Sequence, residues 1–299
     1  MLIHIGYHKT ATSWLQALYF SQHPNIHYPI EYEQLWQHLI SPHGLEFDLH
    51  HAQQYFNTVF TAPANKIPVI SSERLSGNPH SGGFDSKEIA NRLKQLFPHA
   101  KILIVVRNQV DMILSNYKQY IKAGGIVTLN DYMHPPVDGR LPLFRLDNFK
   151  YDKLAAYYCQ LYGKENVSVM LYEQFQQQPL QFINLLNEFI GITTPIAYQF
   201  QQQVNKSPSD SYIALKRYAN HLNGGSSFLP KKVIMPRLYQ KIIQGLEYME
   251  HFQWIQQKKY LWHTQIEQDI QNYYAESNHM LNKSFSLSLE NYTYCLTNK

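Results

Sequence analysis

The chain has 299 residues, of which 44% are hydrophobic, and this is enough to bury the core of one large domain or two small ones. Its formal net charge is +4 and the charges are scattered, which suits an anionic ligand and gives only weak support for nucleic acid, so we expect no nucleic-acid partner. The 15 histidines and two cysteines show no metal-ligand spacing, so the composition excludes common zinc modules and a disulfide framework.

The start of the chain and its apolar runs indicate where the protein resides. The first expected strand begins at residue 2, which leaves no room ahead of it for a signal peptide. No apolar run approaches the roughly 18 residues that a membrane span needs. We therefore expect a soluble cytoplasmic protein, in a compartment reducing enough for Cys159 and Cys295 to remain thiols. Nothing in the sequence indicates an oligomeric state.

Four short runs rich in Ile and Val are expected to form strands, because they are continuous rather than alternating, as in a parallel sheet buried on both faces. Helical periodicity separates them. The alternation predicts an α/β domain with a parallel central sheet and crossover helices, in a three-layer α/β/α arrangement. The expected strands are LIHIG (2–6), IPVISS (67–72), KILIVVR (101–107) and NVSVMLY (166–172), and the expected helices cover residues 12–20, 86–97, 110–121 and 153–163.

The second half of the chain contains two less regular regions. Residues 124–149 hold glycines and prolines without a clean period, and a loop of this length is usually functional, so we expect it on the acceptor side of a site. Residues 193–299 are rich in Gln, Tyr and Lys and show helical but no strand patterns. Because no repeat or linker separates these parts, we expect a single domain over 1–299 with a helical C-terminal cap.

The stretch GYHKTATSWLQ (6–16) joins the first strand to a helix. Unpaired N–H groups and the positive dipole end favour an anion at a helix start. Lys9 adds a point charge, and three hydroxyl side chains follow it, although Thr12 or Ser13 could simply cap the helix. The nucleoside-triphosphate loop GxxxxGK[ST] is absent, because the only glycine ahead of Lys9 in this turn is Gly6.

A second candidate anion contact follows the third expected strand. KILIVVR ends in Arg107, where a phosphate-loop kinase would need an aspartate to hold Mg²⁺. Arg107 can offer a forked pair of N–H donors to a phosphate, and Ser115 in the next helix can offer a hydroxyl. Taken singly, the two residues also fit a surface arginine and a solvent-facing serine. Together they predict a site built on cationic side chains with no metal ligand.

Both elements resemble those of the sulfotransferases that use 3′-phosphoadenylyl sulfate (PAPS). GYHKTATSWL resembles their 5′-phosphosulfate loop, and a strand ending in Arg107 with Ser115 eight residues later resembles their 3′-phosphate element. The resemblance implies a bacterial-type sulfotransferase with a phosphate-loop-like fold, PAPS as donor, PAP (the desulfated nucleotide) as product, and no metal. The nucleotide-binding residues that it implies are Lys9, Thr10, Ala11, Thr12, Ser13, Trp14, Arg107, Ser115 and Tyr172.

Three further segments carry weaker resemblance or depart from the family pattern. Ala11 stands where the family usually has glycine, so we expect a slightly different turn or one that tolerates a methyl group. Trp14 and Tyr172 are implied to approach the adenine, although Trp14 could equally pack in the core, and Gln174 replaces the usual aspartate after Tyr172. YAESNHML (274–281) resembles the closing helix of many bacterial relatives.

The resemblance also implies catalytic roles. Lys9 would stabilise the departing phosphate, and a glutamate downstream of His23-Pro24 would be the general base. Glu33 fits the family pattern better than Glu31, but both also suit a solvated helix start. Arg74, in SSERLS (71–76), would contact the sulfuryl group or the acceptor, or else form a surface pair with Glu73. His8 occupies a variable family position and is not assigned.

These features predict transfer of a sulfuryl group from PAPS to a hydroxyl or amine of a carbohydrate, lipid or small molecule. Two alternatives remain from the sequence. One is a phosphate-loop kinase with degenerate motifs, and the other is a nucleotide-binding protein without catalysis, in which Lys9 serves affinity alone.

Overall fold

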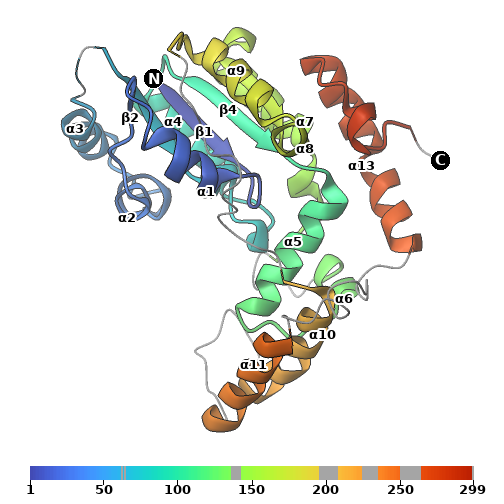
Figure 1. The fold of residues 1–299 in the computed structure, drawn as a ribbon. Helices are drawn as coiled ribbons and strands as arrows, with labels where there is room; N and C mark the ends of the chain where they lie inside the picture. Colours follow the sequence, from blue (N-terminus) through green and yellow to red (C-terminus); the bar gives the residue numbers. More distant parts are fainter. Residues whose placement is uncertain are drawn as a thin grey trace.

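A computed structural model shows the architecture of the protein (Figure 1). It describes residues 1–61, 63, 65–135, 143–194, 208–223, 235–249 and 264–297. At its centre is a five-stranded parallel sheet in the order β2-β3-β1-β4-β5. The strands are β1 (Leu2–Gly6), β2 (Ile26–His27), β3 (Ile67–Ser71), β4 (Lys101–Val106) and β5 (Val167–Leu171).

The four expected strands form, and the prediction of a parallel sheet is confirmed. The sequence did not predict β2, because a two-residue edge strand is too short to produce a hydrophobic pattern. From β1 the chain leads to β2 and β3 on one side, and from β4 it leads to β5 on the other. The carboxyl ends of β1 and β4, which pair through Gly6 and Val105, therefore flank the point where the connections diverge. Open α/β sheets bind ligands in the crevice at such a point.

Helices occupy most of the remaining described chain, and those expected near residues 86–97, 110–121 and 153–163 form within a few residues of their predicted bounds. The helix expected over 12–20 is a single α-helical turn that continues as π-helix over Leu15–Phe20, and α2 continues likewise over Trp36–Ile40. The α-helices are α1 (Thr12–Trp14), α2 (Tyr32–Leu35), α3 (Leu49–Val59), α4 (Ser86–Leu96), α5 (Gln109–Lys122), α6 (Leu129–Met133), α7 (Tyr151–Tyr162), α8 (Tyr172–Gln177), α9 (Pro179–Ile190), α10 (Asp210–Ala219), α11 (Pro236–Met249) and α13 (Thr264–Phe285).

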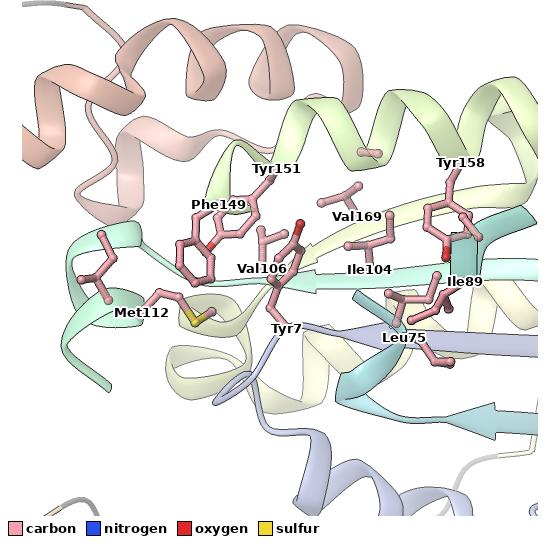
Figure 2. Packing of buried hydrophobic residues seen from close by; sticks show 14 of the residues in the cluster. Tyr7, Leu75, Ile89, Ile104, Val106, Met112, Phe149, Tyr151, Tyr158 and Val169 are labelled. Atoms are coloured by element: carbon pink, nitrogen blue, oxygen red, sulfur yellow. The ribbon is translucent and has the colours of Figure 1, made fainter. Parts of the chain in front are cut away.

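Each face of the sheet carries its own hydrophobic cluster, because successive side chains of a strand point to opposite faces. On β4, Ile104 and Val106 belong to the cluster that includes residues of α4, α5, α7 and α13. Leu103 and Val105 belong to the cluster that includes residues of α1 and α9. Figure 2 shows the first cluster, where Tyr7 packs edge-on against Tyr151 at a ring-centroid distance of 4.7 Å. The predicted three-layer α/β/α arrangement is thereby confirmed.

Residues 124–149 are more ordered than the sequence predicts, although residues 136–142 lie outside the described part. The expectation of a loop is wrong for Leu129–Met133, which form α6. Thr128 begins this helix: its hydroxyl accepts a hydrogen bond from the Asp131 N–H at 3.2 Å and donates one to the Asp131 carboxylate at 2.6 Å. Five residues are too few to reveal a helical period. A 3₁₀ turn, Leu146–Phe149, closes the segment.

The described C-terminal residues form helices, as expected. The helix α10 packs against α5 and α11. In Figure 1, α10 and α11 lie together at a distance from the sheet. The helix α13 packs against α7 and α5. The segment 274–281 lies within α13. Among the described residues, no helix combines the length and apolarity that a membrane crossing requires.

Candidate functional site

The loop that follows β1, residues 7–11, is fixed to the sheet at its first residue and is braced by a hydrogen bond within the loop. The Tyr7 N–H donates to the Val105 carbonyl at 3.3 Å, and the fully buried Thr10 hydroxyl donates to the Tyr7 carbonyl at 2.5 Å. Lys9 and Ala11 both adopt left-handed backbone, with φ of 66° and 61°. Left-handed residues in a tight turn can direct successive N–H groups toward one point, which makes a concavity suited to an anion.

Ala11 keeps the conformation that glycine adopts most easily. A left-handed residue with a Cβ costs about 1–2 kcal/mol, so the loop accommodates the methyl group at that cost. Ala11 is also the residue at which the helix begins, because its carbonyl accepts from the Leu15 N–H at 3.0 Å. The expectation that Thr12 or Ser13 caps the helix is therefore wrong, and no side chain caps the first N–H groups of α1.

Thr12 and Gly6 form a close contact at the base of this loop. The Thr12 hydroxyl is buried and has no hydrogen-bond partner within the described residues. A Cβ at Gly6 would collide with that hydroxyl oxygen, which explains glycine at the end of β1. A buried hydroxyl without a partner is the kind of group that a bound ligand satisfies. Ser13, the next residue, is half-buried on α1.

Arg107 lies at the end of β4, directly beside the loop of residues 7–11. Its Nη1 donates to the Lys9 carbonyl at 3.4 Å, and its guanidinium lies 4.8 Å from the centre of the Tyr172 ring. Its Nε is buried and has no hydrogen-bond partner in the described part of the chain. The structure therefore brings the two cationic residues and Tyr172 to one edge of the sheet. Ser115 lies farther along α5, half-buried and with no hydrogen bond among the described residues.

Positive charge and partial burial shape the electrostatics at Lys9. Desolvation lowers the pKa of Lys9, and the charges of Lys122 and Arg107 act in the same direction. The carboxylate of Glu73 opposes this shift. An ammonium group that is partly stripped of water interacts more strongly with a nearby anion than one in bulk solvent does.

Trp14 lies mainly in the core. Its side chain is 5% exposed, and its ring centre is 5.0 Å from that of Phe175 on α8. This is the packing role that the sequence allowed, and stacking of Trp14 on an adenine remains a prediction.

The residues proposed for the acceptor side occupy two different surroundings. Glu31 and Glu33 are exposed at the start of α2, where they line an open hollow with Tyr32 and Trp36. Arg74 bonds to Asp85 at 2.5 Å, and its guanidinium lies 5.6 Å from the centre of the Trp36 ring. Arg74 therefore joins the hollow to the end of β3 and forms no pair with Glu73.

Sequence reasoning left His8, His80 and Glu73 without roles, yet His8 and Glu73 interact electrostatically with Lys9, and His80 interacts with His8. Burial lowers the pKa of His8 to about 3, and the neighbouring charge of His80 adds to this effect. His80 Nδ1 lies 3.1 Å from the Tyr132 hydroxyl. Desolvation raises the pKa of Glu73, while Lys9 opposes the change. The signal that could have identified Glu73 is its position just past β3, the strand next to β1.

A second group missed by the sequence lies behind Arg107. The Glu173 carboxylate accepts from the Asn108 N–H at 2.8 Å and from the Tyr294 hydroxyl at 3.1 Å. The Asn108 side chain in turn donates to the Thr293 carbonyl at 3.1 Å. Residues near the C-terminus thus support the turn that follows β4. No sequence pattern marks Tyr294 for this role.

Comparison with known proteins identifies this arrangement. The family model described as the sulfotransferase domain matches residues 1–276. The chain belongs to the sulfotransferase domain family. The sulfotransferase from Alicyclobacillus acidocaldarius is 19% identical with a TM-score of 0.52, and the match covers 84% of this chain and 95% of that one, so the two share a fold. The sulfotransferase domain from the curacin biosynthetic pathway is 13% identical with a TM-score of 0.47, and the match covers 96% and 98% of the two chains. No curated protein matches the sequence.

The site of this sulfotransferase is dominated by cationic and hydroxyl groups. Within the described ranges, no cluster of three His, Cys, Asp or Glu side chains is arranged to hold a metal ion. The loop after β1 and the turn after β4 together present Lys9, Arg107 and the unpartnered hydroxyl of Thr12. Such a set can neutralise the negative charge of a sulfate or phosphate ester.

Proposed function

We propose that this sulfotransferase moves a sulfuryl group from PAPS to a hydroxyl or amine of a carbohydrate, lipid or small-molecule acceptor. The observation that carries the proposal is the contact between the Lys9 carbonyl and Arg107, because it sets two cationic elements beside each other at the end of adjacent strands. PAPS carries anionic groups at both its 5′ and 3′ positions. Binding such a donor requires one cationic element for each of its two anionic groups.

The residues present fit a nucleotide of this kind. The Thr12 hydroxyl and the Arg107 Nε are both buried without a partner among the described residues, and each can donate a hydrogen bond to a phosphate oxygen. We assign the backbone of residues 9–13 and the Thr12 and Ser13 hydroxyls to the 5′ end. Thr10 contributes through its backbone, because its hydroxyl proton is already donated to Tyr7. Arg107 and Ser115 are assigned to the 3′-phosphate, and Tyr172 to the adenine side.

The proposed chemistry depends on Lys9. PAPS supplies an activated sulfuryl group, and negative charge develops on the 5′-phosphate as that group departs. An ammonium group held against this charge stabilises the transition state, and one such donor is typically worth about 3–4 kcal/mol. A sulfuryl group bears one charge fewer than a phosphoryl group, so the proposed reaction needs no metal ion.

We propose the acceptor side of the site from the positions of three side chains. Glu33 and Glu31 line a hollow beside Trp36, and Arg74 connects this hollow to the end of β3. Their assignment as alternative general bases, and that of Arg74 to the sulfuryl group or acceptor, remain predictions. The proposed location is the cytoplasm, where reducing conditions suit the free thiols of Cys159 and Cys295.

Two measurements test the proposal. Calorimetry with PAP should show binding that does not depend on Mg²⁺, and a screen with sulfur-labelled PAPS across sugars, phenols, lipids and amines should label one acceptor class. A protein that binds PAP but labels no acceptor would support the non-catalytic alternative. Labelling that is lost when Mg²⁺ is chelated would contradict the metal-independent mechanism.

A further inference from the structure

Glu73 is held beside the loop of residues 7–11 by the pairing of β3 with β1. His4 aligns with Ser71 in this pairing, and the Ser72 N–H donates to the His4 carbonyl at 3.3 Å. Glu73 is the next residue and begins a 3₁₀ turn, Glu73–Ser76. The turn is fastened to the end of β1, because the Ser76 hydroxyl donates to the Gly6 carbonyl at 3.4 Å. Backbone contacts thus fix Glu73 near the point where the loop carrying Lys9 leaves the sheet.

The Glu73 carboxylate has no competing partner. It forms no hydrogen bond or ion pair within the described residues, and its neighbour Arg74 is directed to Asp85 instead. It interacts electrostatically with Lys9, yet the two side chains are not in ion-pair contact. The Lys9 ammonium therefore acts on the carboxylate without occupying its oxygen atoms, which stay available to accept a proton.

The groups around Glu73 favour its action as a base. Desolvation raises the pKa of the Glu73 carboxyl, which makes its ionised form a stronger base, while Lys9 favours the ionised form. His8 and His80 face the same corner, and burial keeps both largely neutral by lowering their pKa. Arg74, the next residue in the sequence, is paired with Asp85. Lys122 and Arg107 add positive charge on the Lys9 side of the corner.

Glu31 and Glu33 lack these features. Both are exposed on α2 and line the open hollow with Tyr32 and Trp36, and no contact among the described residues connects either one to Lys9. Their position suits the entrance through which an acceptor reaches the site.

We propose that Glu73, and not Glu33 or Glu31, is the general base of the reaction; this rests on the proposed function. The acceptor oxygen attacks sulfur and forms the new S–O bond, while the bond between sulfur and the bridging 5′-phosphate oxygen breaks. The electron pair of that bond leaves with the phosphate beside Lys9. The acceptor proton passes to a Glu73 carboxylate oxygen and is then released to solvent.

The test runs the reaction in reverse, with PAP and aryl sulfates. In that direction protonated Glu73 donates a proton to the departing phenol. 4-Nitrophenolate needs little such help because it is a stable anion, whereas phenolate, with the high proton affinity of a tyrosine side chain, needs much. General acid–base catalysis contributes about 10²–10⁴-fold, so Glu73→Gln should slow transfer from phenyl sulfate about 100-fold or more and transfer from 4-nitrophenyl sulfate less than tenfold.

The exposed Glu46→Gln is the matched control, and it should leave transfer from both sulfates unchanged. Glu33→Gln and Glu31→Gln test the rival assignment, and neither should lose transfer from phenyl sulfate selectively. Calorimetry should show PAP binding to Glu73→Gln within threefold of the wild type, which verifies that the variant is folded. Equal losses from both sulfates in Glu73→Gln, or the selective loss appearing in Glu33→Gln, would overturn the assignment. A wild type that transfers from neither sulfate to PAP, and that labels no acceptor in the screen with sulfur-labelled PAPS, would instead overturn the proposed function, and the role of Glu73 with it.

Discussion

The Arg107 Nη1 donates a hydrogen bond to the Lys9 carbonyl at 3.4 Å, across the adjacent ends of β4 and β1. Because the bond uses the backbone of Lys9, its ammonium group stays available for a ligand. The guanidinium also lies over the Tyr172 ring, and its Nη2 is 3.8 Å from Asp111 Oδ2, so it is held by three contacts. One nucleotide could therefore contact both cationic side chains at once.

Arg107→Ala should distinguish nucleotides by their 3′ group. We expect the variant to bind PAP at least tenfold more weakly, because a charge-assisted hydrogen bond contributes about 1.5–3 kcal/mol. Binding of adenosine 5′-phosphosulfate, which lacks the 3′-phosphate, should change much less. Titration calorimetry measures both, with the exposed Arg237→Ala as a control for lost surface charge. Equal losses for the two nucleotides would place Arg107 away from the 3′-phosphate.

Lys9→Ala should separate binding from turnover. We expect sulfuryl transfer to fall by a factor of about 10²–10³, since removal of one donor to a developing oxyanion has this effect. PAP binding should stay measurable, because Thr12 and Arg107 remain. A labelled-PAPS assay and calorimetry give the two readings, and the exposed Lys241→Ala should match the wild type in both. Unchanged transfer in Lys9→Ala would remove its catalytic assignment.

Ala11→Gly should stabilise the protein slightly. Glycine relieves the left-handed strain at φ 61°, worth about 1–2 kcal/mol, but it also loses about 0.4–1 kcal/mol through a more flexible unfolded chain. We expect a net gain below about 1 kcal/mol in the free energy of unfolding, measured by urea denaturation. A clear loss of stability would show that the loop does not hold the left-handed turn in solution. Ala17→Gly, at an exposed helical position, should destabilise instead.

The buried histidines should make stability depend on pH. Burial lowers the pKa of both His4 and His8 to about 3, whereas each returns to its ordinary value of about 6.5 on unfolding. The unfolded state therefore binds more protons as the pH falls below about 6.5, and stability is lost on acidification. Between pH 7 and 5 we expect a loss of about 2 kcal/mol for each histidine, measured by urea denaturation.

Two variants test the origin of this loss. His4→Asn should reduce the difference in stability between pH 7 and 5 by about 2 kcal/mol, whatever its effect at pH 7 alone. The exposed His50→Asn should leave the difference unchanged. If stability stays constant from pH 7 to 5, neither His4 nor His8 is held neutral in the folded protein.

Tyr294→Phe should weaken the support behind Arg107. The variant loses the hydrogen bond to the Glu173 carboxylate, which should cost about 1.5–3 kcal/mol of stability because the acceptor is charged and half-buried. PAP affinity should fall severalfold while the affinity for adenosine 5′-phosphosulfate changes less. Tyr292→Phe, which removes a hydroxyl that forms no hydrogen bond among the described residues, is the matched control. If Tyr292→Phe produces the same loss, the effect does not come from Glu173.

Local patterns predicted the parts of this protein that depend on neighbouring residues in the sequence. Continuous Ile and Val runs predicted β1, β3, β4 and β5, because a strand buried on both faces needs no polar positions. The motif around Lys9 predicted the loop, yet not its left-handed path, since alanine gives no signal for it. The helix α3 was missed although Asp48 caps it by accepting from the His51 N–H at 2.9 Å.

The long-range contacts that complete the candidate site could not be predicted from local sequence patterns. Glu73 becomes adjacent to Lys9 only through the pairing of β3 with β1, and Tyr294 reaches Glu173 across 121 positions of the chain. Neither hydrophobic periodicity nor a local motif indicates which residues far apart in the sequence come into contact. Knowing the strand order would have placed Glu73 correctly, but the strand order itself is set by the three-dimensional packing.

The bond between Asn108 and the Thr293 carbonyl has a consequence for biosynthesis, because 185 positions separate the two residues. After adding Asn108, the ribosome must add 185 more residues before the Thr293 carbonyl can accept the hydrogen bond that supports the turn after β4. The sheet can assemble while translation continues, but the turn that carries Arg107 is fully supported only when synthesis is nearly complete. Premature termination between the end of α13 and Thr293 would then yield chains that keep α13 packed on α5 and α7 and lack the support behind Arg107.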